Sequence, residues 1–412
     1  MERALLPVPA GTPDDGSVTR LLSALEAALE GTGPALAPGR PRFEAEGDRA
    51  GDADGGATRA GHVTVPGEVA VVLRTSGSTG DPRDVMIDAA ALHASARATH
   101  ARLGGPGRWV LALPTDHVAG VQVLVRSLDA GRAPVVVRPG RFDPAALASA
   151  VARAAADGAP VHTALVPTQL HRVVEAAGDA LTGDLAPLLD LTSVLVGGAG
   201  TPAPLLDRAH ALGLPVITTY GMTETAGGCV YDGTPLDGVS VRTEPDGRVL
   251  LAGPVLARGV LGRPELDARL FVEHDGRRWL RTTDVGEMTH GALRVLGRAD
   301  DVIVTGGVNV APAAVEDVIT ALAGVRGACV VGVPDPEWGR SVVAVVVPAG
   351  AAPSLDQVRD AVRRRLGPAA APRHLVLVDA LPERGPGKTD RAGAARLAAH
   401  RLAVGPEGLS AP

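Results

Sequence analysis

Short apolar runs alternate with Ala-rich stretches through the middle of the chain. Six runs predict strands: VAVVL (69–73), WVLAL (109–113), PVVV (134–137), HTALV (162–166), SVLVG (193–197) and VITT (216–219). The stretches between them predict helices over 88–101, 119–130, 143–156, 168–177 and 202–212. Strands that are apolar throughout and separated by helices are typical of a sheet buried on both faces. We therefore expect an α/β fold with layered, mostly parallel sheets.

The segments on either side have other patterns. Residues 17–29 predict an amphipathic helix whose leucines share one face, and residues 31–62, rich in Gly, Pro and charge, predict an irregular surface segment. After Gly221, short strands predicted at 239–242, 249–252, 279–281 and 293–295 indicate a β-barrel-like annex. Past Arg298 a smaller α+β unit follows, with helices predicted over 312–323 and 354–366. We thus divide the chain into an N-terminal domain (1–298), a C-terminal domain (299–400) and a tail (401–412).

Composition excludes several classes of protein. The 412 residues carry a net charge of −6 and no basic tract, which argues against nucleic-acid binding. The two cysteines, Cys229 and Cys329, form no CxxC pair, and no HExxH motif is present, so neither a zinc site nor a disulfide framework is indicated. No apolar run is long enough for an integral membrane segment. We expect a soluble protein of the reducing cytoplasm.

Lys388, in LPERGPGKTDR (381–391), is the only lysine among 40 basic residues. A lysine ammonium is a compact point charge on a thin stem, whereas the arginine guanidinium is a wide planar fork. A crowded reaction centre can therefore require lysine. Chance placement in a surface loop is the alternative.

The stretch RTSGSTGDPRDV (74–85) follows a predicted strand and has the composition of a phosphate-binding loop. Ser76, Ser78 and Thr79 supply hydroxyl groups, and Gly77 and Gly80 allow backbone amides to face inward. The sequence lacks the Gly-Lys-Ser/Thr end of a Walker A loop. An ordinary Ser/Gly turn is the alternative.

Two further motifs offer groups for the rest of a nucleotide. In YGMTE, Tyr220 offers a face for a purine, Thr223 a hydroxyl for a phosphate, and Glu224 a hard oxygen for Mg²⁺. In RTTDVGE (281–287), Asp284 follows a predicted strand and could accept hydrogen bonds from both ribose hydroxyls. The alternatives are a helix N-cap at Thr223 and a turn cap at Asp284.

Taken together and in this order, TSGSTGDPR, YGMTE, RTTD, GRADDVIVTGGVNV and GPGKTDR resemble the adenylate-forming acyl-CoA synthetase superfamily. The resemblance extends from about Val69 to Ala394. Within it, LPTDHVAG (113–120), LVPTQL (165–170) and GGAGTP (197–202) resemble the o-succinylbenzoate–CoA ligases of menaquinone synthesis. The resemblance implies an enzyme that binds ATP, Mg²⁺, coenzyme A and a small carboxylic acid. It also implies that the small C-terminal domain is mobile.

The resemblance assigns a role to individual residues. Those implied to bind the nucleotide are Thr75, Ser76, Gly77, Ser78, Thr79, Gly80, Arg83, Tyr220, Gly221, Met222, Thr223, Asp284 and Arg298. The implied catalytic residues are Lys388, Thr223, Glu224 and His117, with Glu224 also the Mg²⁺ ligand. Further implied roles are the hinge at Asp300, the coenzyme A tunnel at Gly306 and Gly307, and an acyl pocket formed by His117, Gly197 and Gly198.

Two residues depart from the family pattern, because Arg83 stands where Lys is usual and Thr283 where Gly is usual. The departures leave open a non-catalytic nucleotide-binding relative. Another aryl- or alkyl-acid CoA ligase and a carrier-loading domain are further alternatives. The sequence does not distinguish a monomer from a homodimer.

Overall fold

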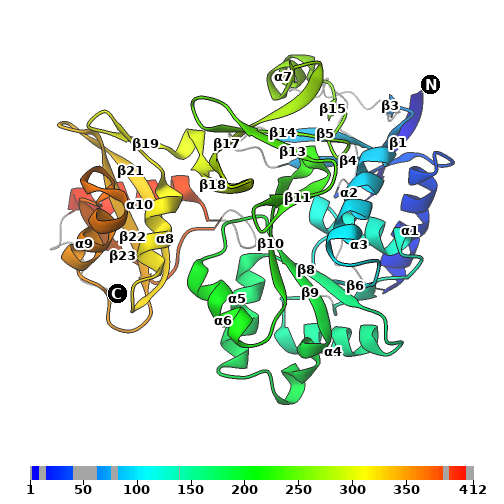
Figure 1. Cartoon of the computed structure of the whole chain (residues 1–412), viewed down its shortest axis with the longest axis horizontal. Coiled ribbons are helices and arrows are strands. Elements are labelled where there is room, and N and C mark those ends of the chain that lie inside the picture. The colour runs from blue at the N-terminus through cyan, green and yellow to red at the C-terminus, as the bar shows by residue number, and fades with distance from the viewer. Residues whose placement is uncertain are drawn as a thin grey trace, which may run out of the picture.

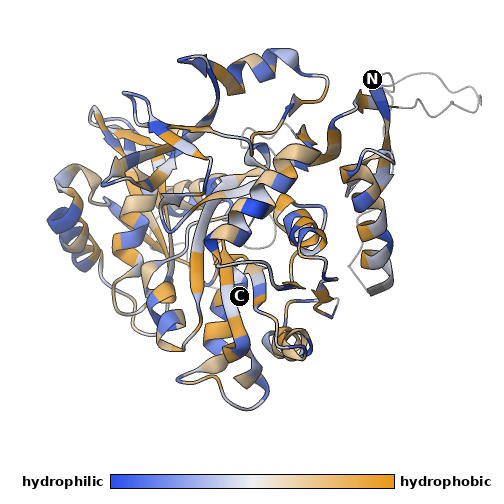
Figure 2. Ribbon diagram, turned by 45° about the vertical axis from the view of Figure 1, so that its right-hand side comes forward, coloured by the Kyte–Doolittle hydropathy of each residue, from blue (hydrophilic) through white to orange (hydrophobic). Residues whose placement is uncertain are grey.

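The computed structural model describes residues 2–8, 15–39, 63–75, 82–138, 140–383 and 389–404. Figure 1 shows a large body that contains three sheets and, at the left, a smaller unit that runs from yellow to red. Figure 2 shows apolar residues concentrated on the central strands. Among the described residues, no helix is long and apolar enough to cross a membrane.

A seven-stranded sheet forms the centre of the large body, in the order β12-β11-β10-β9-β8-β6-β7. Its parallel strands are β6 (Arg108–Leu111), β7 (Val135–Val136), β8 (Val161–Leu165), β9 (Leu191–Val196) and β10 (Val216–Met222), and β11 (Gly227–Tyr231) and β12 (Thr234–Pro235) complete it antiparallel. Helix α2 (Ala89–Arg102) precedes β6, and the helices between the parallel strands are α3 (Val118–Asp129), α4 (Pro144–Ala155), α5 (Pro167–Ala177) and α6 (Ala203–Ala211). The strands and helices predicted for this region are confirmed.

A second sheet, of six strands, has mixed direction. Its order is β15 (Gly259–Val260), β5 (Arg83–Asp88), β4 (Val69–Thr75), β2 (Ala35–Pro38), β1 (Glu2–Val8) and β3 (Thr64–Pro66). The pairs β1–β2 and β2–β4 are parallel and the others antiparallel, so the prediction of mostly parallel strands fails for this sheet. Helix α1 connects the parallel strands β1 and β2, whereas β4 and β5 are consecutive strands that pair antiparallel.

The strand β2 corrects the prediction that residues 31–62 form an irregular surface segment. All four residues of β2 are buried, between β1 and β4. The segment is too short for its periodicity to be read, and its neighbours in the sheet come from distant parts of the sequence. The predicted helix before it is confirmed as α1 (Asp15–Leu29).

The predicted annex is a curled, half-barrel-like antiparallel sheet. It consists of β13 (Ser240–Thr243), β14 (Arg248–Ala252), β16 (Phe271–His274), β17 (Arg277–Thr289) and β18 (Ala292–Arg298), with α7 (Pro264–Leu270) beside it. Strand β17 has 13 residues, so Asp284 lies inside a strand and not after one. The sequence pattern did not predict this length, because polar residues such as Thr283 and Asp284 interrupt the apolar run. One face of an antiparallel sheet can carry such residues.

The C-terminal unit has a separate core. A hairpin of β19 (Ile303–Thr305) and β20 (Val308–Val310) precedes a three-stranded sheet of β21 (Val325–Asp335), β22 (Gly339–Pro348) and β23 (His374–Leu377). Helices α8 (Pro312–Thr320) and α9 (Leu355–Leu366) pack on one face of this sheet. Helix α10 (Arg391–Val404) packs on the other through Ala394 and Ala398. The predicted helices at 312–323 and 354–366 are confirmed.

Candidate active site

Tyr220 and Asp284 lie next to each other, although they come from different sheets. Tyr220 is in β10 and donates a hydrogen bond to Asp284 Oδ2 in β17, with an O–O distance of 2.8 Å. Burial raises the pKa of Tyr220 well above its ordinary value, and the Asp284 charge raises it further, so the phenol remains a donor. Burial also raises the pKa of Asp284, while the Tyr220 hydrogen bond and Arg298 lower it. The two residues predicted to contact adenine and ribose are thus brought together.

Glu224 faces the site from the 3₁₀ turn η2 (Thr223–Thr225), which directly follows β10. The residue is only 8% exposed, and Arg83 Nη1 lies 3.9 Å from its Oε1. Burial raises the pKa of Glu224, and the positive charge of Arg83 opposes that shift. The backbone carbonyl of Glu224 accepts a hydrogen bond from Ala257, which fixes the turn. Glu224 is therefore a buried carboxyl group whose charged form is favoured by a neighbouring cation such as Arg83.

Glu224 suits a magnesium ion that arrives with a nucleotide. In the part of the chain that the structure describes, no three His, Cys, Asp or Glu side chains form a group that could hold a metal. Mg²⁺ is commonly bound by one or two carboxylates together with substrate phosphates and water. A single buried carboxylate fits such an ion when phosphates and water supply the remaining ligands.

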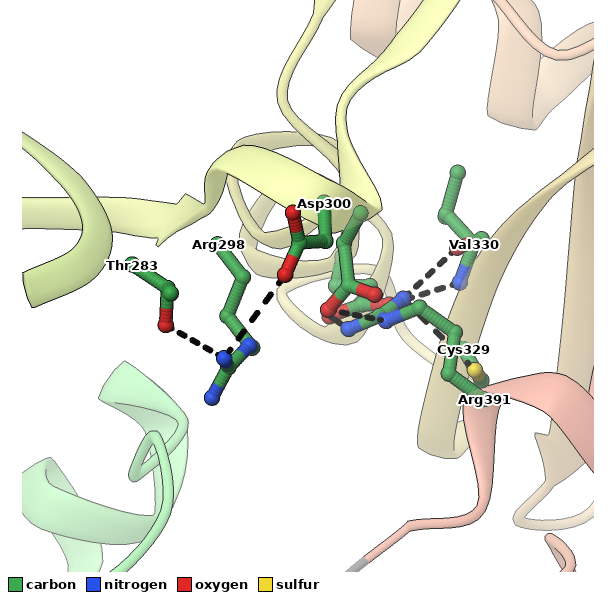
Figure 3. Close-up of polar contacts among 8 residues, drawn as sticks. Thr283, Arg298, Asp300, Cys329, Val330 and Arg391 are labelled. Carbon is green, nitrogen blue, oxygen red and sulfur yellow. Dashed lines mark hydrogen bonds and ion pairs between the residues drawn. The ribbon is translucent and has the colours of Figure 1, made fainter. Parts of the chain in front are cut away.

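Thr283, the second departure from the family pattern, orients Arg298. In adjacent strands β17 and β18, Asp284 and Arg298 are register partners. The Arg298 guanidinium donates a hydrogen bond to Thr283 Oγ1 through Nη2, and the same nitrogen lies 4.0 Å from Asp300 Oδ2 (Figure 3). The Cβ and hydroxyl of Thr283 are thus accommodated, and they supply an acceptor that glycine would lack.

The predicted phosphate loop lies between two described strand ends. Thr75, the last residue of β4, is the register partner of Arg83, the first residue of β5. Arg83 is therefore a strand residue directed towards Glu224. The other predicted residues of this loop lie outside the described residues, as does the predicted catalytic lysine: Ser76, Gly77, Ser78, Thr79, Gly80 and Lys388.

The glycines predicted for the acyl pocket are constrained, Gly197 by the close approach of Thr219 and Gly198 by its positive φ. A Cβ on Gly197 would lie 2.3 Å from Thr219 Oγ1, and Gly198 has φ +84°. His117 is at the N-cap position of α3, where its side chain is 63% exposed. Nothing in this arrangement tests the acyl pocket, which stays a prediction.

The glycines predicted for the coenzyme A tunnel form the turn between β19 and β20. Gly306 and Gly307 have φ of +55° and +79°, and a Cβ on Gly306 would lie 2.7 Å from Trp338. Asp300 lies in η3 (Ala299–Asp301), between β18 and this hairpin. The structure places Asp300 at the junction of the two units, and its role as a hinge stays a prediction.

The sequence did not reveal the partners of two arginines, Arg298 and Arg391. Thr283 was noted as a departure but not as the partner of Arg298. Arg391 was part of the GPGKTDR motif, yet nothing in the sequence distinguished it from the exposed arginines of the same helix. Its partners, Glu316 and Asp301, lie 75 and 90 positions earlier in the sequence, and only the fold brings them together.

Comparison with known proteins identifies the family. Residues 15–288 match the AMP-binding enzyme family, and residues 314–388 match the AMP-binding enzyme C-terminal domain. The chain therefore belongs to the AMP-binding enzymes, as its motifs indicated. It is 42% identical over 397 residues to a Mycobacterium tuberculosis protein named "Probable 2-succinylbenzoate–CoA ligase", which covers 95% of this chain and 97% of the relative.

Two solved structures have a similar fold. The o-succinylbenzoate CoA synthetase MenE from Bacillus subtilis, in complex with the acyl-adenylate OSB-AMP, has a TM-score of 0.67 and 27% identity. The match covers 79% of this chain and 68% of MenE. The amide bond synthetase McbA from Marinactinospora thermotolerans has a TM-score of 0.72 and 28% identity, over 96% of this chain and 80% of McbA.

Proposed function

We propose that this protein is an ATP-dependent 2-succinylbenzoate–CoA ligase. The enzyme would transfer AMP from ATP to the carboxylate, with release of pyrophosphate, and then transfer the acyl group to coenzyme A. The 42% identity to the Mycobacterium tuberculosis ligase, over nearly the whole of both chains, is the observation that carries the substrate. The convergence of Tyr220, Glu224 and Asp284 at the end of β10 supports nucleotide chemistry there.

The nucleotide would lie along the end of β10. Tyr220 would stack on adenine while its phenol holds Asp284, whose second carboxylate oxygen is left for the ribose. Arg298, oriented by Thr283, would contact the ribose from the neighbouring strand. Thr75 and the loop that follows it would bind the pyrophosphate end. Gly221 and Met222 would line the base, and Thr223 would contact the α-phosphate.

The first step must bring two negatively charged groups together, the substrate carboxylate and the α-phosphate of ATP. A carboxylate oxygen must attack the α-phosphorus while the bond from that phosphorus to the bridging oxygen of pyrophosphate breaks. Both reactants are anionic, so the step needs cations where the new bond forms. We assign this role to Lys388, and Arg83 would neutralise the departing phosphates. A Mg²⁺ ion held by Glu224 would supply further positive charge at the phosphates.

The second step needs a different arrangement. The thiol of coenzyme A attacks the acyl carbon, the bond to the phosphate oxygen breaks, and AMP leaves. We propose that the C-terminal domain (299–400) rotates about Asp300, so that Lys388 withdraws and the Gly306–Gly307 turn faces the large domain (1–298). His117, Gly197 and Gly198 would surround the acyl group. The proposal also keeps the cytoplasmic location that the sequence predicts.

An amide synthetase is a second candidate. The structure of the amide bond synthetase McbA matches 96% of this chain, whereas that of MenE matches 79%. The two candidates differ in the nucleophile, which would be an amine in the second case. Product formation from the same adenylate with coenzyme A or with amines separates them.

A panel of carboxylic acids tests the proposed function. We expect ATP-dependent release of AMP and pyrophosphate with 2-succinylbenzoate, faster than with benzoate or medium-chain fatty acids, and a thioester when coenzyme A is added. A higher kcat/KM with a comparison acid would contradict the substrate but not the class. Absence of pyrophosphate release with every acid, from protein that is folded and binds ATP, would favour a non-catalytic relative.

A further inference from the structure

Arg391, the first residue of α10, is bound by acceptors from three other elements (Figure 3). Its guanidinium forms a two-pronged pair with Glu316 of α8, in which Nη2 lies 3.1 Å from Oε2. It also donates to the carbonyl oxygen of Val330 in β21 at 2.6 Å, and its Nε lies 3.3 Å from Asp301 Oδ2 in η3. Only 27% of the side chain is exposed. We call Arg391, Glu316 and Asp301 the arginine clamp.

The clamp is held independently at its Glu316 end. Glu316 Oε1 also accepts a hydrogen bond from the backbone N–H of Val330 at 2.7 Å. The Glu316 carboxylate is therefore attached to β21 by a hydrogen bond that does not involve Arg391. Hydrogen bonds and charge attraction from Glu316 raise the pKa of Arg391 despite its burial, so the guanidinium remains charged.

Both described ends of the segment that contains Lys388 meet next to the clamp. Glu383 and Thr389 form an antiparallel β-bridge, and the N–H of Asp390 donates to Pro382 O at 2.7 Å. The first turn of α10 starts at this point, where the N–H of Ala394 donates to Asp390 O at 2.8 Å. Thr389 directly follows Lys388 in the sequence, so the clamp lies beside one described end of the segment that contains the lysine.

The other side of the clamp is the junction between the two units. Asp301 directly follows Asp300, which lies 4.0 Å from the Arg298 guanidinium of the candidate nucleotide site. Arg391 thus connects the base of the Lys388 segment with the residues that join the small unit to β18. One side chain thus joins two parts of the chain, at Asp301 and Arg391, that are 90 positions apart in the sequence.

We propose that Arg391 is a positioning residue that makes the junction at Asp300–Asp301 and the base of the Lys388 segment move as one body. This inference rests on the proposed function, because it assigns Arg391 to the adenylation step through Lys388. The guanidinium fork meets three acceptors in different directions, whereas a lysine ammonium could satisfy only part of the set. Arg391→Lys should therefore keep the charge and lose the geometry.

Separate measurement of the two half-reactions tests the proposal. We expect Arg391→Lys to lower pyrophosphate exchange by about 10²-fold, mostly in kcat, because a misplacement of about 1 Å can have that effect. Thioester formation from preformed acyl-adenylate should be unchanged, because Lys388 does not act in that step. Arg401→Ala, an exposed arginine of the last turn of α10, is the matched control and should leave both half-reactions unchanged. Equal loss of both half-reactions, or no loss of adenylation, would overturn the proposal.

Hydrogen exchange separates this inference from the proposed function. In the unmodified protein we expect the amides of Val330, Asp390 and Ala394 to be protected. In Arg391→Lys and Asp301→Asn, protection at Asp390 and Ala394 should fall while that of Val330 is retained through Glu316. Unchanged protection at Asp390 and Ala394 would refute the clamp even if the protein adenylates no acid. An unmodified protein that shows this protection pattern but no pyrophosphate exchange would refute the proposed function and, with it, the catalytic part of the inference.

Discussion

The Tyr220 phenol donates its hydrogen bond to Asp284 across 64 positions of sequence, and this bond joins the central sheet to the half-barrel. The bond stabilises the charged form of a carboxylate whose pKa burial raises. Under the proposed function, we expect ATP binding to depend on the ionisation of Asp284.

Tyr220→Phe should keep the aromatic face and remove the donor. The pKa of Asp284 should then rise further. Because we expect ATP binding to need the charged carboxylate, acidification should abolish binding at a higher pH in the variant than in the unmodified protein. Removing one partner of a buried hydrogen bond also costs about 1–3 kcal/mol of unfolding free energy. Titration calorimetry with ATP as a function of pH and urea unfolding check the two effects. An unshifted pH profile would show that Tyr220 does not control Asp284.

Glu224→Gln should weaken the magnesium dependence of adenylation while the fold is kept. The amide is nearly isosteric but carries no charge, so a higher Mg²⁺ concentration should be needed for half-maximal pyrophosphate exchange. Glu265→Gln, an exposed glutamate of α7, is the matched control. A magnesium titration of Glu224→Gln that coincides with the control would mean that Glu224 only stabilises the turn.

Thr283→Val should weaken ATP binding, because Arg298 loses its hydroxyl acceptor. A hydrogen bond to a charged group contributes about 1.5–3 kcal/mol, and exposure of Arg298 reduces this value, so we expect the KM for ATP to rise about tenfold. Thr283→Ser retains the hydroxyl and should behave like the unmodified protein. If valine and serine give the same KM, the hydroxyl has no part in binding.

Lys388→Ala and Lys388→Arg should both impair adenylation, since the step needs a compact cation between two anions. Loss of one contact of this kind lowers the rate by about 10²–10³-fold. Thioester formation from preformed acyl-adenylate should continue. Pyrophosphate exchange measures the first step and thiol consumption the second. Equal loss of both activities in a folded variant would contradict the proposed rotation of the C-terminal domain between the two steps.

The sequence predicted the central sheet well because helices separate its strands and each strand is continuously apolar. It failed at Ala35–Pro38, where a four-residue strand is flanked by glycine and proline and is paired by β1 and β4. It also missed that Asp284 lies within β17, because alternation on a half-exposed strand places Thr and Asp among apolar residues.

The sequence motifs name the residues of the candidate site but do not reveal their contacts. Tyr220, Glu224 and Asp284 were identified from their motifs, whereas the partners of Arg298 and Arg391 were not. The partner of a long polar side chain depends on which residues the tertiary fold places beside it. Glu316 and Arg391, for example, are 75 positions apart in the sequence. Such pairs leave no local pattern in a single sequence.

The unfolding free energy should fall on mild acidification because buried basic residues surround Trp109 of the central sheet. Arg126 is 3% exposed, with its guanidinium carbon 4.9 Å from the ring centroid of Trp109. His162 is fully buried beside the same ring, and its Nδ1 lies 2.8 Å from Ser193 Oγ. Burial, together with the nearby charges of His100 and Arg126, lowers the pKa of His162 from 6.5 to about 4.

A histidine whose pKa is lowered in the folded state binds its proton preferentially in the unfolded state. His162 should therefore destabilise the fold progressively as the pH falls from 6.5 towards 4, by about 1–3 kcal/mol in total. His162→Gln cannot be protonated in this range, so its unfolding free energy should fall less steeply with pH. Urea unfolding between pH 7.5 and 4.5 measures both slopes, with His171→Gln, a partly exposed histidine of α5, as the control. Equal slopes for the unmodified protein and His162→Gln would show that His162 does not cause the acid sensitivity.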